Sequence, residues 1–118
     1  MAEYTSRAGT TYVLRADLNV LGSLQARYGS MTDAVRQTDS VAELLKIAAE
    51  MINEDRLFCG RPDRITAAQL GAELTGADLA GLTEAVSDAV AESMGVDNVK
   101  KKKPPKAGKR RFPFRSGG

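Results

Sequence analysis

The sequence contains no histidine, no tryptophan and a single cysteine, Cys59. Without histidine, the usual zinc sites, His-based triads and Cys-His nucleophiles cannot be assembled. Neither a GxGxxG motif nor the Lys-Ser/Thr ending of a phosphate-binding loop occurs. Carboxylates alone can serve as acid and base, but the acidic residues form no distinct pair. The sequence therefore predicts a non-enzyme with no cofactor, no metal site and no small-molecule substrate.

Long hydrophobic runs are also missing. No apolar stretch approaches the roughly 20 residues that a membrane-spanning helix requires. The N-terminal MAEYTSRAGTTY has no hydrophobic segment of signal-peptide length, and one cysteine cannot form an internal disulfide. We therefore expect a cytoplasmic protein that does not engage a membrane. With only three Phe and three Tyr, its core must be built from Leu, Ala, Val and Met.

Charge is divided unevenly along the 118 residues. Residues 99–118 carry nine Lys and Arg and no acid, whereas the first 98 hold the other eight basic residues and all fifteen acidic ones, so +9 and −7 sum to +2. We therefore divide the chain into a domain, residues 1–98, and a basic Pro/Gly-containing tail, residues 99–118, which its charge and prolines predict to be disordered. The basic residues of the tail are Lys100, Lys101, Lys102, Lys103, Lys106, Lys109, Arg110, Arg111 and Arg115, and its aromatic residues are Phe112 and Phe114.

The N-terminal part of the domain predicts a strand followed by a helix. Residues 11–14 are β-prone, and Asp17 is placed to cap the first turn of a helix. Gly29 offers a left-handed stop to that helix, and residues 30–39 are expected to form one or two helical turns at most. The apolar face of the helix is formed by Leu18, Leu21, Leu24 and Tyr28.

Further helices follow. Ser40 and Glu43 have the spacing of a capping box, and the helix after them has one apolar face. Gly60 and Pro62 interrupt the periodicity and indicate a loop, whose two apolar residues we expect to dock on the core. The face of the helix comprises Val41, Leu44, Leu45, Ala48, Met51 and Ile52, and the docking residues of the loop are Leu57 and Phe58.

Thr66 and Gln69 again have capping spacing, and they predict a short helix that ends near Leu74. A long helix then runs to Gly95. The fold class is therefore mainly α: a small bundle of about four helices with a short N-terminal β-strand and a disordered basic C-terminal tail. The stripe of the last helix comprises Leu79, Leu82, Val86, Ala89, Val90 and Met94.

This stripe has two interpretations. One-sided apolar helices ordinarily close a core. Alternatively, four helices with few aromatic residues leave part of the stripe uncovered, and the surplus binds a partner or a second copy. The residues that we predict to bind a partner are Leu79, Leu82, Val86 and Val90.

The tail also has several interpretations. It is a solubilising end, or it binds nucleic acid, with its cations displacing phosphate counterions and Phe112 and Phe114 stacking on bases. A third interpretation is attraction to the acidic body of a neighbouring copy, which would favour self-association.

The order of these segments resembles the tail assembly chaperones of long-tailed bacteriophages and related prophages, over roughly residues 10 to 95. The resemblance lies in a strand leading into a helix that ends in Tyr-Gly, an acidic pair near the end of the next helix, and a short segment before a final Ala-rich helix. The residues that carry it are Asp17, Leu18, Asn19, Leu21, Tyr28 and Gly29, then Glu54 and Asp55, then Ile65, Thr66, Leu70, Gly71 and Leu74.

The resemblance implies a non-catalytic protein that binds the tape measure protein and recruits tail tube subunits in the cytoplasm of an infected or lysogenic bacterium. It also implies a longer product made by a −1 ribosomal slip. Because slippery sites are often A-rich and A-rich codons encode lysine, Lys100–Lys103 is the candidate slip site, although the same codons encode any basic tail. The alternatives are a small nucleic-acid-binding protein that acts through its tail, and a structural virion component.

Overall fold

The computed structural model describes residues 2–95. The predicted basic tail, with Lys100–Lys103, Phe112, Phe114 and the other cations named above, lies outside the described residues. Within residues 2–95 the fold is mainly α-helical, as the sequence predicts, with five α-helices, two short 3-10 helices (η1 and η2) and one β-hairpin. One hydrophobic core joins these elements.

The N-terminus forms a hairpin where the sequence predicted a single strand. β1 (Ala2–Thr5) pairs antiparallel with β2 (Thr11–Leu14), and Tyr4 lies opposite Tyr12. Gly9, at φ 94°, supplies the left-handed residue in the connection between the strands. β1 carries only one large apolar side chain, so it lacks the alternation that marks a strand in sequence.

α1 (Leu18–Tyr28) begins and ends as predicted. Asp17 accepts the backbone N–H of Val20 at 3.1 Å, and Gly29 ends the helix at φ 95°. Residues 30–39, predicted to form one or two turns at most, supply the N-cap Ser30, α2 (Met31–Arg36) and η1 (Gln37–Asp39). These short helices bring the chain round to the start of α3.

α3 (Val41–Phe58) begins at the predicted cap, where Ser40 Oγ accepts the backbone N–H of Glu43 at 3.4 Å. The Glu43 carboxylate accepts hydrogen bonds from the Tyr28 hydroxyl and from Lys46 Nζ. The glutamate of the predicted box therefore fastens the end of α1 to the start of α3.

The docking predicted for Leu57 and Phe58 is wrong. α3 continues through both residues, and they project outward with 60% and 69% of their surface exposed. The guanidinium carbon of Arg15 lies 3.7 Å from the centre of the Phe58 ring, and Arg15 Nε donates to Asp55 at 3.3 Å. Phe58 thus packs against a cation at the surface, because the extra helical turn turns it away from the core.

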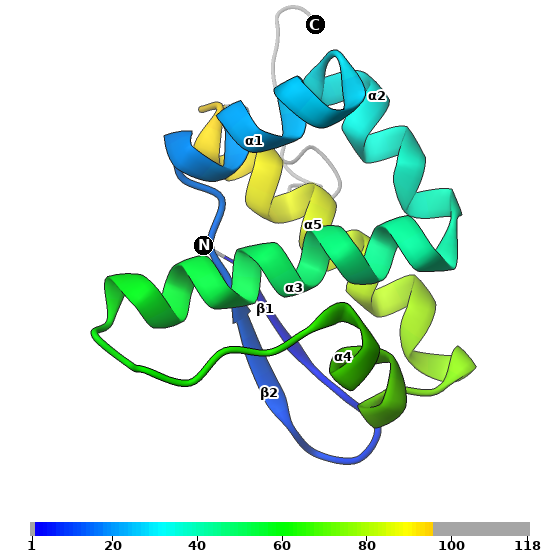
Figure 1. Cartoon of the computed structure of the whole chain (residues 1–118). Coiled ribbons are helices and arrows are strands. Elements are labelled where there is room, and N and C mark those ends of the chain that lie inside the picture. The colour runs from blue at the N-terminus through cyan, green and yellow to red at the C-terminus, as the bar shows by residue number, and fades with distance from the viewer. Residues whose placement is uncertain (1, 96–118) are drawn as a thin grey trace, which may run out of the picture.

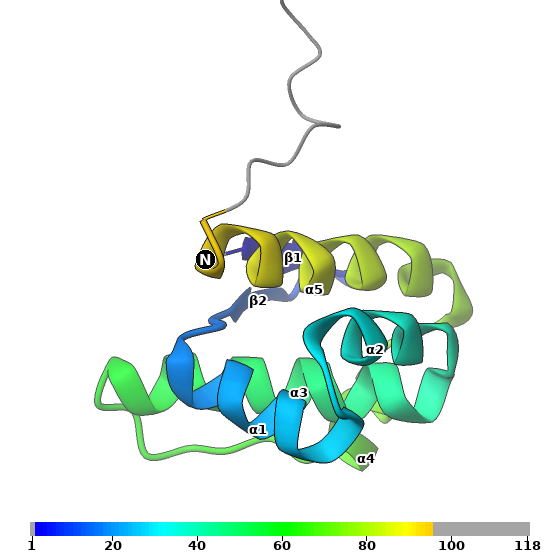
Figure 2. The ribbon, with the colours of Figure 1, turned by 90° about the horizontal axis from the view of Figure 1, so that it is seen from above.

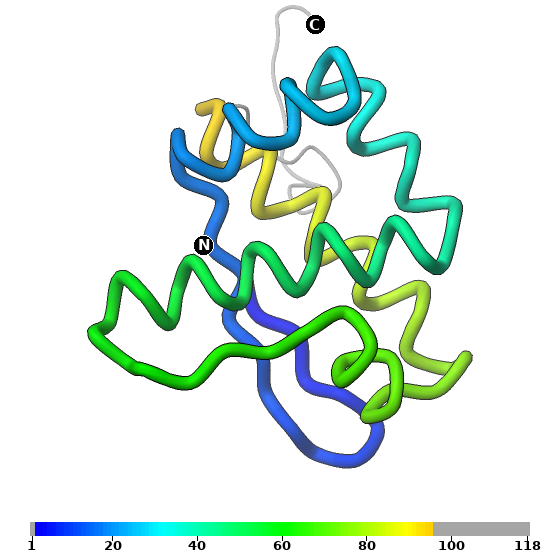
Figure 3. Tube along the Cα trace, in the orientation of Figure 1, coloured from blue at the N-terminus to red at the C-terminus, as the bar shows by residue number. Residues whose placement is uncertain are grey.

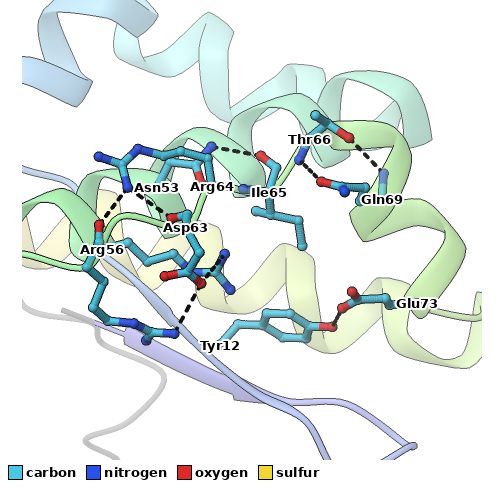
Figure 4. Close-up of polar contacts among 10 residues, drawn as sticks. Tyr12, Asn53, Arg56, Asp63, Arg64, Ile65, Thr66, Gln69 and Glu73 are labelled. Carbon is cyan, nitrogen blue, oxygen red and sulfur yellow. Dashed lines mark hydrogen bonds and ion pairs between the residues drawn. The ribbon is translucent and has the colours of Figure 1, made fainter.

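The chain then returns beneath α3 to α4 (Ala67–Glu73), a path that is clearest in Figure 3. Asn53 on α3 binds both backbone groups of Ile65: its Nδ2 donates to the carbonyl and its Oδ1 accepts the N–H, each at 2.8 Å. Figure 4 shows these contacts beside the complete Thr66–Gln69 capping box. The same view shows the Tyr12 hydroxyl donating to Glu73, which ties β2 to α4.

η2 (Gly76–Asp78) leads into α5 (Leu79–Ser93). In Figure 1, α3 crosses in front of α5, and Figure 2 shows α5 and the hairpin on one side with α1 and α3 on the other. β1 contacts α5 and β2 contacts α3, so the hairpin bridges the two layers.

No helix within residues 2–95 has the length and apolar character needed to cross a bilayer. The largest fully buried apolar side chains are Leu14, Val20, Leu24, Leu44, Ile47, Met51, Leu70, Leu82 and Val86.

Candidate partner-binding groove

The predicted partner-binding stripe of α5 is mostly core. Leu82, Val86 and Val90 are buried, and Ala85 and Ala89 are buried beside them. β1, β2 and α3 all contact α5, so its apolar side has little surface left over. Three of the four predicted contact residues are therefore inaccessible to a partner, and the stripe closes the core. Of these four, Leu79 alone is partly exposed, and Met94, at the end of the longer stripe, has 51% of its surface exposed.

Leu79 lines an open groove between the N-terminal ends of α3 and α5, which lie on the right of both Figure 1 and Figure 2. The volume of this groove is about 550 Å³. Val41 stands at its edge with 50% of its surface exposed, and Leu44 forms part of its floor. We call it the α3–α5 groove; its lining is Thr38, Asp39, Val41, Leu44, Leu79, Ala80, Thr83, Glu84 and Ser87.

A smaller groove continues from it toward α4. This second hollow has a volume of about 210 Å³, and Val41 and Leu79 line both. Gly71 lets α4 approach α3 closely, since a Cβ at this position would come within 3.0 Å of Leu45. Val41 and Leu79 therefore form an apolar ridge with a hollow on each side, a shape that accepts side chains of an apolar partner segment.

Local capping sets the position of this ridge. Ser40 caps α3, so Val41 is the first helical residue and remains at the surface. Thr75 and Asp78 form a capping box in which Thr75 N–H and Oγ1 donate to Asp78 Oδ2 at 2.9 and 3.3 Å. This turn places Leu79 at the start of α5, and the Thr-x-x-Asp spacing is the sequence signal from which it could have been found.

Asp78 also anchors the hairpin. Its Oδ1 accepts the Tyr4 hydroxyl at 2.6 Å and the backbone N–H of Arg7 at 2.9 Å, and only 1% of the residue is exposed. These hydrogen bonds, that of Tyr4 foremost, lower the pKa of Asp78 from its ordinary 3.8 to about 2. A buried carboxylate, ionised at neutral pH, thus fixes the end of α5 that carries the groove.

The rim of the α3–α5 groove is acidic. Asp39 and Glu84 are exposed, and within residues 2–95 neither carboxylate takes part in an ion pair or hydrogen bond. All acidic residues except Asp97 lie in this described part, so its fourteen acids and eight basic residues give it a net charge of −6. The groove is therefore suited to a partner that combines apolar and cationic side chains.

The opposite end of α3 has a different character. Arg56 Nη1 and Arg61 Nη2 lie 3.2 and 3.3 Å from the carboxylate of Asp63, and Arg64 donates to nearby carbonyls, as Figure 4 shows in part. The described chain thus has a basic end near residues 56–64 and an acidic groove at the start of α3.

Within residues 2–95, no group of three or more His, Cys, Asp or Glu side chains is arranged to hold a metal ion.

The described part of the chain is thus a mainly α-helical domain with an N-terminal hairpin and an open groove of apolar and polar residues. No protein-family model matches the chain, and neither the curated proteins nor the solved structures that were searched gave a match. The likeness to tail assembly chaperones rests on the motif residues named above.

Proposed function

We propose that the protein is a non-catalytic tail assembly chaperone of a long-tailed bacteriophage or prophage. It binds the tape measure protein and brings tail tube subunits to it. The observation that carries this proposal is the α3–α5 groove, an open hollow of mixed lining that presents the apolar side chains of Val41 and Leu79 at the surface. A long helical client that would otherwise aggregate offers apolar side chains at helical spacing to fill such a hollow.

The motif residues of the resemblance hold the fold together, which supports the proposal. Asp17 and Gly29 begin and end α1, and Asn19 Nδ2 donates to Glu54 at 3.2 Å, joining α1 to α3. Asp55 pairs with Arg15 in the segment that follows β2. Residues from distant parts of the motif thus meet, as expected if the pattern specifies one shared fold.

The size of the groove favours weak contacts. Full burial of a Val or Leu side chain contributes about 1.5–3 kcal/mol, and Val41 is already half buried, so it adds about 1 kcal/mol. A single groove would hold its client loosely, and several copies along one client would hold it together. Loose binding is what displacement by arriving tube subunits requires.

The test is co-expression of the full chain with the tape measure protein of the same genome, comparing Val41→Glu with Leu18→Glu. Both residues are the first of a capped helix, and both are exposed, Val41 by 50% and Leu18 by 81%. We expect the native chain and Leu18→Glu to keep the tape measure protein in solution and co-purify with it, whereas Val41→Glu does not. Equal behaviour of the two variants would remove the groove from the proposal.

The same system separates the alternatives. A chaperone without residues 99–118 should still bind the tape measure protein and should be absent from purified particles. A nucleic-acid-binding protein would instead lose its binding with that deletion, and its affinity would fall steeply with salt. A virion component would be found in purified particles. Intact-mass analysis of the gene expressed with its downstream frame tests whether a longer product arises near Lys100–Lys103.

A further inference from the structure

The rim charges of the α3–α5 groove have no partners among residues 2–95. Elsewhere in residues 2–95 several acids are paired, such as the half-buried Glu50 with Arg27 and the exposed Asp63 with Arg56. Asp39 and Glu84, in contrast, flank the apolar floor with no ion pair or hydrogen bond within residues 2–95. An occupant of this groove should therefore present apolar groups between cations.

The chain itself contains such a segment. Residues 110–115 read RRFPFR, with two aromatic side chains between three arginines, and residues 99–118 contain no acid. We propose that residues 110–115 bind in the α3–α5 groove, with Phe112 and Phe114 against Val41 and Leu79 and the arginines beside Asp39 and Glu84. The groove is then a docking site for the protein's own C-terminal segment.

Chain length allows this docking within one molecule. Phe112 lies 17 positions after Gly95, and an extended chain spans at most about 3.3–3.6 Å per position, or about 56–61 Å in all. α5 has 15 residues and is therefore about 22 Å long, so the segment can return from the end of α5 to its start. The charge difference between the tail and the body, +9 against −6, favours this return.

Charge also directs the segment to this groove rather than to the exposed apolar residues at the C-terminal end of α3. The Arg15 guanidinium stacks on the exposed Phe58 ring, Arg56 lies two residues before Phe58 on α3, and Arg61 and Arg64 lie in the loop that follows. A segment with three arginines is repelled by that basic end and attracted by the rim of the groove. The acidic groove at the start of α3 is thus the favoured site.

A consequence is competition. Any partner that uses Val41 and Leu79 must displace residues 110–115, so the tail lowers the apparent affinity of the groove for that partner. This inference does not depend on the identity of the partner, and its test contains no client protein. Its failure would therefore leave the proposed chaperone function untouched.

The test uses the full chain with Cys59→Ser and Ser116→Cys, so that a nitroxide label can be attached beside the segment. Paramagnetic broadening is then measured on the backbone amides of the ¹⁵N-labelled protein. We expect strong broadening at Val41, Ala80 and Thr83, and none at Leu57. Broadening centred on Leu57 and the basic loop, or equally weak broadening everywhere, would overturn the proposal.

Two paired variants check the charge argument. Asp39→Lys with Glu84→Lys should reduce the broadening at Val41 to the level seen at Leu57. Glu3→Lys with Asp33→Lys makes the same change in net charge at exposed positions outside the groove, and it should leave the broadening in place. Equal loss in both pairs would show general attraction and contradict a specific site. Mixing labelled and ¹⁵N-enriched molecules distinguishes docking within one chain from docking between copies.

Discussion

The Tyr4 hydroxyl donates a 2.6 Å hydrogen bond to Asp78 Oδ1, across 74 positions of the sequence. This hydrogen bond connects β1 to the turn that starts α5. It therefore also links the hairpin to the end of the α3–α5 groove. The same carboxylate accepts the backbone N–H groups of Arg7 and Thr75. One buried side chain therefore orders three segments that are remote in the sequence.

We predict that Asp78→Asn lowers the urea midpoint of unfolding, and that it does so by more than Tyr4→Phe. In Asp78→Asn the side-chain NH₂ group replaces one carboxylate oxygen, so a donor would face the donors that Asp78 now accepts. Tyr4→Phe, in contrast, removes one hydrogen bond and leaves the others. Circular dichroism in urea measures both. Glu3→Gln, at an exposed carboxylate outside the groove, is the control and should not shift the midpoint.

Acid should remove the contribution of Asp78. Because the pKa of Asp78 is lowered from 3.8 to about 2 by folding, its stabilising effect is complete above about pH 4 and is lost as the pH falls toward 2. The difference in urea midpoint between the native protein and Asp78→Asn should therefore be constant from pH 7 down to about 4 and then shrink. A difference that stayed constant down to pH 2 would contradict this assignment.

Alkali should act through the tyrosines. Burial and the hydrogen bond to Glu73 raise the pKa of Tyr12 from 10 to about 12, and the pKa values of Tyr4 and Tyr28 are also raised. The stability that these groups contribute is present below pH 10 and is lost as the pH rises through their folded pKa values. Absorbance of tyrosinate should therefore appear later in the folded protein than in urea. Tyr12→Phe should remove the component that titrates near pH 12.

Gly81→Ala should destabilise the protein, although the same exchange inside a helix normally stabilises by about 1 kcal/mol. A Cβ at residue 81 would overlap the Tyr4 ring, and the hydrogen bond to Asp78 prevents the ring from moving aside. Overpacking of this kind costs about 1–3 kcal/mol. In a Tyr4→Ala background the clash is absent, so the same exchange should become neutral or stabilising. Urea unfolding of the native protein, the two single variants and the double variant measures the change of sign.

Features set by neighbouring residues could be predicted from the sequence. Asp17, Ser40 and Thr66 cap their helices as expected, and Gly29 ends α1, because a cap forms between groups three or four residues apart. Composition is equally independent of the fold: the sequence has no histidine, the residue that His-based triads and Cys-His nucleophiles require.

Only the tertiary structure decided which apolar residues are covered. Leu82 and Val86 lie on the same stripe as Leu79, yet the hairpin and α3 bury the first two and leave the third at the groove. The sequence predicted that Phe58 docks on the core, but its ring is exposed at the surface and stacks against the Arg15 guanidinium. Helical periodicity determines which residues share a face, but coverage of that face depends on segments such as β1, more than 70 residues away, whose docking is held by contacts like that of Tyr4 with Asp78.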